Sequence, residues 1–159
     1  MTVSQARFRD AMSAFATGVT VVTALGEEGV PFGITANAVT SVSLHPPLVL
    51  VCIDRASSSH DPIVDAGAFA LNVLGAGQEG LARRFSGDRH DRRFRDVEFS
   101  SRETGSPVLE TALAWLDCRM WNTLGAGDHT VLFGEVADCG AEEGEPLLFF
   151  RGAFRRPRW

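Results

Sequence analysis

The amino-acid sequence predicts a mostly β protein with flanking helices, whose strands form an antiparallel β-barrel. Three observations favour this fold class: six or seven apolar, β-branched runs, mostly short connections between them, and few segments with helical spacing. A barrel pairs its own edge strands and so leaves no edge exposed. The 159 residues suffice for one domain, residues 1–159, with a single sizeable core.

The first segment predicts a helix. Thr2 and Gln5 have the spacing of a capping box, in which two side chains satisfy free backbone amides. The apolar side chains that follow share one helical face: Phe8, Met12 and Phe15. The helix is expected to end at Gly18.

Two pairs of apolar runs predict β-hairpins. Residues 19–25 and 30–39 flank a Gly-Glu-Glu-Gly turn, and residues 112–123 and 130–139 flank a glycine-rich connection. Further strands are predicted at residues 48–53, 69–74 and 147–150, and helices at residues 61–66 and 77–85. Residues 86–102 are dense in charge, and we expect them to form a mobile surface excursion before the strand pattern resumes.

Composition excludes several classes of protein. The formal net charge of −5 disfavours a general nucleic-acid or anionic-membrane binder. The first residues carry charges where a signal peptide needs an apolar run, and no stretch approaches the roughly 20 apolar residues of a membrane span. Three dispersed cysteines without a CxxC spacing argue against a disulfide framework or zinc site. We therefore expect a cytoplasmic protein that binds neither nucleic acid nor membrane.

Two segments carry hydroxyl groups in positions that suit a ligand. Residues 33–43 end a strand in small and hydroxylated residues, which let a backbone approach a flat ligand closely. Residues 57–59 are three serines just before a predicted helix start, where free amides favour an anion, and Arg83 and Arg84 add positive charge. Taken alone, ordinary turns and N-capping by Ser59 or Asp61, with solvated arginines, are the preferred explanation of these segments.

A third segment places His129 at the start of a strand, directly after Asp128. The neighbouring carboxylate can tune the charge state of the imidazole. The alternative is a histidine that only makes a structural hydrogen bond. The phenylalanines and tryptophans of the chain, Phe85 among them, are core candidates first.

In their order and spacing, these segments resemble the flavin reductase-like family, which has the FMN-binding split-barrel fold and includes the reductase components of two-component aromatic hydroxylases. The matching stretches cover most of the chain: residues 15–23, 33–54, 57–59, 69–74, 84–85, 127–129 and 146–152. The resemblance implies an antiparallel split β-barrel with a flavin site near a homodimer interface.

The resemblance also implies a role for each candidate site residue. The residues implied to line the ring and ribityl chain, or to lie close by, are Thr35, Ala36, Asn37, Ser41, Val42 and Ser43. Those implied to present backbone to the pyrimidine edge are Cys52, Ile53 and Asp54. Those implied to hold the phosphate, or to pack at the flavin margin, are Ser57, Ser59, Arg84 and Phe85. His129 is implied to face the nicotinamide and is the candidate catalytic residue; no metal site is implied.

The implied activity is transfer of a hydride from NADH or NADPH to FMN or FAD, with reduced flavin supplied to a partner monooxygenase. Hydride transfer is the cofactor's own chemistry, so a site of amides and hydroxyls is adequate. The chain lacks a Rossmann GxGxxG, so the nicotinamide nucleotide is expected to bind transiently in a groove. Three alternatives stay open: a flavin-binding electron carrier or sensor, a flavin-dependent oxidase of the pyridoxamine-phosphate type, and a β-barrel binding module without flavin.

Overall fold

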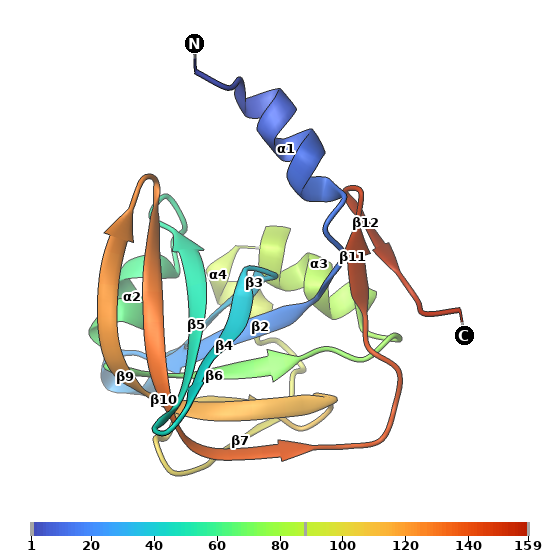
Figure 1. The fold of residues 1–159 in the computed structure, drawn as a ribbon. Helices are drawn as coiled ribbons and strands as arrows, with labels where there is room; N and C mark the ends of the chain where they lie inside the picture. The colour runs from blue at the N-terminus through green and yellow to red at the C-terminus, as the bar shows by residue number, and fades with distance from the viewer. Residues whose placement is uncertain (1, 88, 159) are drawn as a thin grey trace.

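A computed structural model describes residues 2–87 and 89–158 of the chain. Its centre is a seven-stranded antiparallel sheet in the order β3-β2-β6-β9-β10-β5-β4 (Figure 1). The strands are β2 (Thr20–Leu25), β3 (Pro31–Ala36), β4 (Val39–Leu44), β5 (Pro47–Asp54), β6 (Ala68–Val73), β9 (Ala114–Ala126) and β10 (His129–Ala141). The protein is therefore mostly β, and its strands pair antiparallel, as the sequence predicts.

Two smaller sheets and several helices complete the fold. The small strands are β1 (Thr17–Gly18), β11 (Leu148–Phe150) and β12 (Ala153–Arg155) in one sheet, and β7 (Phe99–Ser101) and β8 (Pro107–Leu109) in the other. The helices are α1 (Gln5–Ser13), α2 (His60–Asp65), α3 (Glu79–Gly87), α4 (His90–Arg93) and the 3-10 turn η1 (Glu27–Gly29). Within the described residues, no helix has the length and apolar character needed to cross a bilayer.

The predicted hairpins form, but the predicted closed barrel does not. β2 pairs with β3, and β9 with β10. β3 and β4 are the two edges of the central sheet, and no ladder joins them in the described part of the chain. Only Asn37 and Ala38 connect these strands, so Ala36 and Val39 lie within about 11 Å of each other. The sheet therefore curls until its edges approach at this link without pairing.

The core has two parts, one on each side of β2. One part lies inside the curled sheet and includes Val51, Phe69 and Ile63 of α2. The other part lies under α3, where Phe85 packs with Val21 among others. Together they fix α2 and α3 against the strands that lead to the link between β3 and β4.

Two local predictions are wrong in detail. Ser4, not Thr2, caps α1, because its Oγ accepts a hydrogen bond from the Arg7 amide. α1 ends at Ser13, and its apolar side chains stay in solvent, since it stands away from the central sheet (Figure 1).

The charged excursion is also not all surface. Arg93 is buried, and its Nη1 donates to Gly33 O at 2.8 Å and to Ser59 Oγ at 2.9 Å.

Candidate functional site

A pocket of about 150 Å³ lies where the edges of the sheet approach each other. It is lined by residues 34–38, by residues 52–54 at the end of β5, and by His129 at the start of β10. We call it the junction pocket. His129 pairs with Asp54 across the sheet, which brings two segments distant in sequence together. The structure thus gathers six of the predicted site residues with His129: Thr35, Ala36, Asn37, Cys52, Ile53 and Asp54.

Two larger hollows share the rim of the junction pocket. The first, of about 250 Å³, reaches toward α3 and β12; we call it the α3 hollow. The residues lining it are Val19, Thr35, Ala36, Asn37, Arg83, Ser86, Phe149, Gly152 and Phe154. The second, of about 460 Å³, lies under the apolar face of α1 and includes Leu50 and Cys52. Asn37 lines all three, so an elongated ligand laid across it has room at both ends.

Hydrogen bonds fix the strand end that separates these hollows. Thr35 Oγ1 donates to Ala82 O of α3 at 2.7 Å, so its hydroxyl hydrogen holds β3 against α3. Thr20 Oγ1 donates to Ala36 O at 2.7 Å, and Asn37 Nδ2 donates to Thr17 Oγ1 at 3.2 Å. The segment is therefore held in place before any ligand binds, and small Ala36 lets a flat ring lie close to the backbone.

The end of β5 offers backbone rather than reactive side chains. Cys52 N donates to Ala38 O at 3.0 Å, a hydrogen bond that extends the pairing of β4 with β5 to the link beside the pocket. Burial raises the pKa of the Cys52 thiol, so it is a poor nucleophile. The side chain of Ile53 is buried in the core, and Asp54 Oδ1 accepts from Ala56 N at 2.8 Å within a turn.

His129 is oriented by its neighbour. Its Nδ1 lies 2.7 Å from Asp128 Oδ1, and its side chain is 42% exposed. The hydrogen bond from His129 holds the pKa of the Asp128 carboxyl below its ordinary value, and the backbone and Arg55 act in the same direction. The ionised carboxylate can only accept, so Nδ1 carries the hydrogen of this bond. Nε2 makes no hydrogen bond with the described residues and remains available to a ligand.

Three of the predicted ligand contacts are directed away from the hollows. The Ser59 side chain is fully buried and donates to Gly33 O at 3.0 Å while it accepts from Arg93. Phe85 is also fully buried, and it packs edge-on against Phe94. Arg84 Nη1 donates to Arg95 O at 2.7 Å. In this structure these residues support the site from behind.

The remaining predicted residues lie near the site but line none of these three hollows. Ser57 Oγ accepts from Ser59 N at 3.2 Å in the loop before α2. Ser41, Val42 and Ser43 lie on the edge strand β4, where the pairing with β5 shifts by one residue between the two serines. Their roles toward flavin stay predictions.

Of the two arginines that the sequence offers for a phosphate, the resemblance implies Arg84, whereas Arg83 is the one that lines the α3 hollow. Arg83 pairs with Glu79 at 2.7 Å and lies over the Phe154 ring, 5.1 Å from its centre. Phe149 packs against Phe154, and Ser86 lies one helical turn beyond Arg83. The sequence signal was the i, i+4 spacing of Glu79 and Arg83 on a helix.

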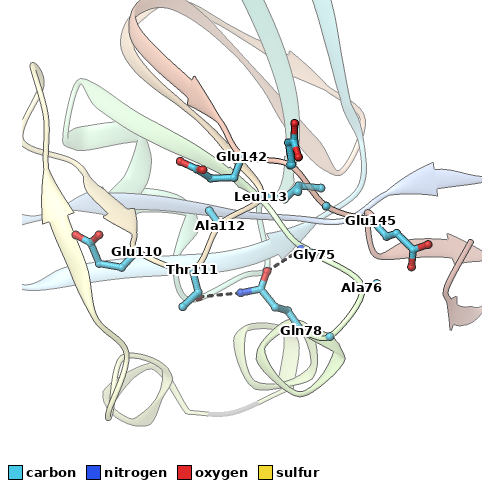
Figure 2. A pocket seen from close by; sticks show the side chains of 12 residues that line it. Gly75, Ala76, Gln78, Glu110, Thr111, Ala112, Leu113, Glu142 and Glu145 are labelled. Carbon is cyan, nitrogen blue, oxygen red and sulfur yellow. Dashed lines mark hydrogen bonds between the residues drawn. The ribbon is translucent and has the colours of Figure 1, made fainter.

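A separate hollow of about 430 Å³ has the opposite character (Figure 2). Four glutamates line it: Glu110, Glu142, Glu143 and Glu145. Gln78 spans one side, accepting from Gly75 N at 2.7 Å and donating to Thr111 Oγ1 at 2.8 Å. Four carboxylates repel a phosphate group, so this acidic hollow does not suit a nucleotide. No cluster of three potential metal ligands occurs among the described residues.

The junction pocket and its neighbours fit a flavin by their donor set. Backbone, small side chains and the imidazole of His129 line the junction pocket, and Arg83 and Ser86 line the neighbouring α3 hollow. A ring system with a polar edge and a phosphate tail matches this order of groups. The described residues of the pocket hold no activated nucleophile and no pair of carboxylic acids, so the site suits the binding and orientation of a reactive cofactor.

Comparisons with known proteins agree with this geometry. Residues 12–158 match the family model described as flavin reductase like domain. An FMN reductase (NADH), SmoA, from Agrobacterium fabrum is 46% identical over 149 residues, which is 94% of this chain and 84% of that protein. The reductase component of 4-nitrophenol 4-monooxygenase/4-nitrocatechol 2-monooxygenase from Rhodococcus opacus is 41% identical over 152 residues, or 96% of this chain and 80% of that protein.

A solved structure extends the agreement to the fold. The NADH:FAD oxidoreductase SgcE6 of Streptomyces globisporus C-1027, in complex with NAD and FAD fragments, superposes with a TM-score of 0.90 and 39% identity. The superposition covers 99% of this chain and 97% of that chain. Because the family model spans nearly the whole sequence, this chain belongs to the flavin reductase like family.

Proposed function

We propose that this chain is an NAD(P)H-dependent flavin reductase that transfers a hydride to FMN or FAD in the junction pocket. The observation that carries the proposal is the meeting of His129 with the ends of β3 and β5 in a pocket without a nucleophile. The curled sheet with two unpaired edges supports a split barrel of the FMN-binding type as its fold.

Each group of residues has a task in this proposal. Thr35, Ala36 and Asn37 support one face of the ring system, and the backbone of residues 52–54 bonds its polar edge. A bound flavin supplies the chemistry by accepting the hydride at its N5 atom. His129 Nε2 positions the nicotinamide at the open side of the pocket, while Asp128 holds the imidazole in one orientation. Correct relative placement of the two rings is the main contribution that the protein makes.

For the phosphate, we propose Arg83 and Ser86 at the far end of the α3 hollow. Arg83 already lies over an aromatic ring with its charge at the rim, whereas Arg84 is bonded to a backbone carbonyl. The alternative is the loop that carries Ser57, with Ser59 and Arg84 behind it. Riboflavin lacks the phosphate, so a comparison of FMN with riboflavin decides between these positions.

We further propose a homodimer whose interface borders the site. α1 and the residues directly after it expose Phe8, Met12 and Phe15 by 60%, 52% and 70%, and all three line the hollow under α1. Apolar side chains gathered in this way mark an interaction surface. The hollow under α1 shares Cys52 with the junction pocket, so a second copy seated there lies beside the flavin. Light scattering at micromolar concentration tests this, and a monomer contradicts it.

We also propose that the reduced flavin leaves to serve a partner monooxygenase in the cytoplasm. The relative from Rhodococcus opacus is named as such a reductase component, which supports this part. Open hollows on both sides of Asn37 give the flavin an exit path.

The activity is tested by NADH consumption in the presence and absence of added FMN or FAD. The proposal expects oxidation of NADH only when flavin is present, and release of flavin on dialysis. NADH oxidation that needs no added flavin after dialysis contradicts the exchange of flavin, and no oxidation with either flavin contradicts the reductase.

A further inference from the structure

A second histidine lies behind the site, at the start of α2. His60 Nδ1 is 2.6 Å from Asp61 Oδ1, and His60 Nε2 is 2.8 Å from Thr130 Oγ1. The His60 side chain is 12% exposed, whereas that of Asp61 is 86% exposed. Because the carboxylate only accepts, Nδ1 carries a hydrogen, and in the neutral ring Nε2 accepts from the Thr130 hydroxyl. One imidazole thus links α2 to β10.

The order Asp61, His60, Thr130 resembles a nucleophile with its base, but its setting argues against that role. Thr130 is only 9% exposed and lines none of the hollows described above. A nucleophile must reach its substrate, so the hydroxyl has no access to one. The three groups instead form a structural link between a helix and a strand.

The position of Thr130 gives this link a functional meaning. Thr130 directly follows His129 in β10 and pairs with Ile53, while His129 pairs with Asp54. Successive side chains of a strand point to opposite faces, so His129 faces the pocket and Thr130 faces α2. The first two residues of β10 lie next to the turn at Gly127, where pairing with β9 begins. A contact at Thr130 therefore restrains the strand beside the imidazole that borders the pocket.

We propose that His60 is a positioning residue for the nicotinamide side of the site: through Thr130, it fixes the backbone that carries His129. This inference rests on the proposed function, in which His129 positions the nicotinamide. Loss of the link lets the start of β10 move, so the nicotinamide is held less well while the flavin contacts on β3 and β5 persist.

The experiment is a double-mutant cycle in the full chain with His60→Ala and Thr130→Val. Each single variant is expected to raise KM for NADH roughly three- to tenfold, the loss of about one hydrogen bond. The double variant is expected to be no worse than either single one, because the two residues act through one contact. The dissociation constant for FMN stays within about twofold.

Conservative variants separate the contact from general packing. His60→Gln and Thr130→Ser keep a hydrogen bond between these positions and are expected to restore KM for NADH. The shorter His60→Asn side chain keeps the hydrogen bond to Asp61 but loses the one to Thr130, so it is expected to behave like His60→Ala. Asp65→Asn, at the other end of α2, is the matched control and leaves KM unchanged.

A readout independent of turnover is hydrogen exchange of the backbone amides around residues 128–131. Thr130→Val is expected to speed exchange there and to leave β6 unchanged. An unchanged KM together with unchanged exchange overturns the proposal. So does a fall in FMN affinity and melting temperature in step with KM, which indicates a purely structural role. If the wild-type chain does not oxidise NADH with flavin, the proposed function fails, whereas the exchange data still report on the link itself.

Discussion

The two ends of the β9–β10 hairpin face very different surroundings. At the turn end, His129 meets the ends of β3 and β5 in a pocket whose lining includes a single carboxylate, that of Asp54. At the open end, Ala114 and Ala141 lead into the acidic hollow, where Glu142 N donates to Leu113 O at 2.8 Å. Both ends carry a hollow, and the acidic hollow, of about 430 Å³, is larger than the junction pocket, of about 150 Å³.

The difference shows that the size of a hollow does not decide what it binds. A nucleotide carries negative phosphate, so the sign of the lining charge selects the turn end even though the acidic hollow has more room than the junction pocket. The middle of the hairpin, between these two ends, belongs to the hydrophobic core, because Cys118 is buried there.

The largest expected effect concerns the thiols in the buried half. Burial, then the charge of Asp117 and then Cys139, raise the pKa of Cys118 from 9.0 to about 12. At pH 8 Cys118 is therefore almost entirely protonated as well as buried, so the exposed Cys139 is expected to react with a thiol reagent much faster. Mass spectrometry of the labelled native chain measures this, and rapid labelling of Cys118 contradicts a buried hairpin core.

The same shift predicts a pH dependence. The unfolded thiol releases its proton from about pH 9 upward, whereas the folded one retains it until about pH 12. The unfolded state therefore binds fewer protons in this range, and the free energy of unfolding falls as the pH rises through it. Cys118→Ala should flatten this slope in urea titrations, and an unchanged slope contradicts the assignment.

The next effect concerns the phosphate end of the site. Arg83→Ala is expected to weaken FMN binding by about 1 kcal/mol, the lower end for a charged hydrogen bond because Arg83 is largely exposed. Arg84→Ala is the matched control and should change FMN affinity less, since it loses a carbonyl partner instead. Fluorescence titration with FMN and riboflavin checks this. Equal losses for both flavins assign Arg83 to packing, and a larger loss for Arg84→Ala favours the Ser57 loop.

A smaller effect is expected at His129 itself. His129→Ala should raise KM for NADH or slow hydride transfer by about 0.5–1.5 kcal/mol, because it removes one positioning contact and no essential base. Flavin affinity should barely change. Steady-state kinetics, flavin titration and melting temperature on this one variant decide the matter. Wild-type kinetics remove His129 from the site, and parallel losses of stability and flavin affinity indicate a turn residue.

The smallest effect is expected at the acidic hollow. Glu142→Gln combined with Glu145→Gln should leave KM for NADH and FMN affinity within about twofold of wild type, because any remaining interaction is long-range and screened by salt. The same kinetic assay at low and moderate salt measures it. A large change in KM for NADH at both salt concentrations indicates that part of the nucleotide binds at the acidic hollow, which contradicts binding at the turn end.

Local pattern predicted the hairpins but not the way the sheet ends. Short connections join β2 to β3 and β9 to β10, whereas the place of β3 and β4 as opposite edges of one sheet depends on ladders between strands far apart in sequence, such as β2 with β6 and β5 with β10. β4 was hidden because its serines and its irregular pairing break the apolar pattern.

The site could be predicted by segment more easily than by side-chain direction. In a sequence, a serine that binds a ligand looks the same as a serine buried in the core. Only the structure shows that Ser59 is buried and accepts a hydrogen bond from Arg93. The structure explains Gly33, because a Cβ there would come within 2.6 Å of the buried Phe85 ring, but the sequence shows only a glycine at this position. Arg93 likewise carried no signal in the sequence, since its acceptors come from two distant segments.

The most direct test of the central claim is a crystal structure of the chain with FMN bound. We expect the flavin ring against Thr35, Ala36 and Asn37, its polar edge at residues 52–54, and His129 beside the face left open for nicotinamide. Density for the ring in the acidic hollow, or at a surface that excludes His129, contradicts it.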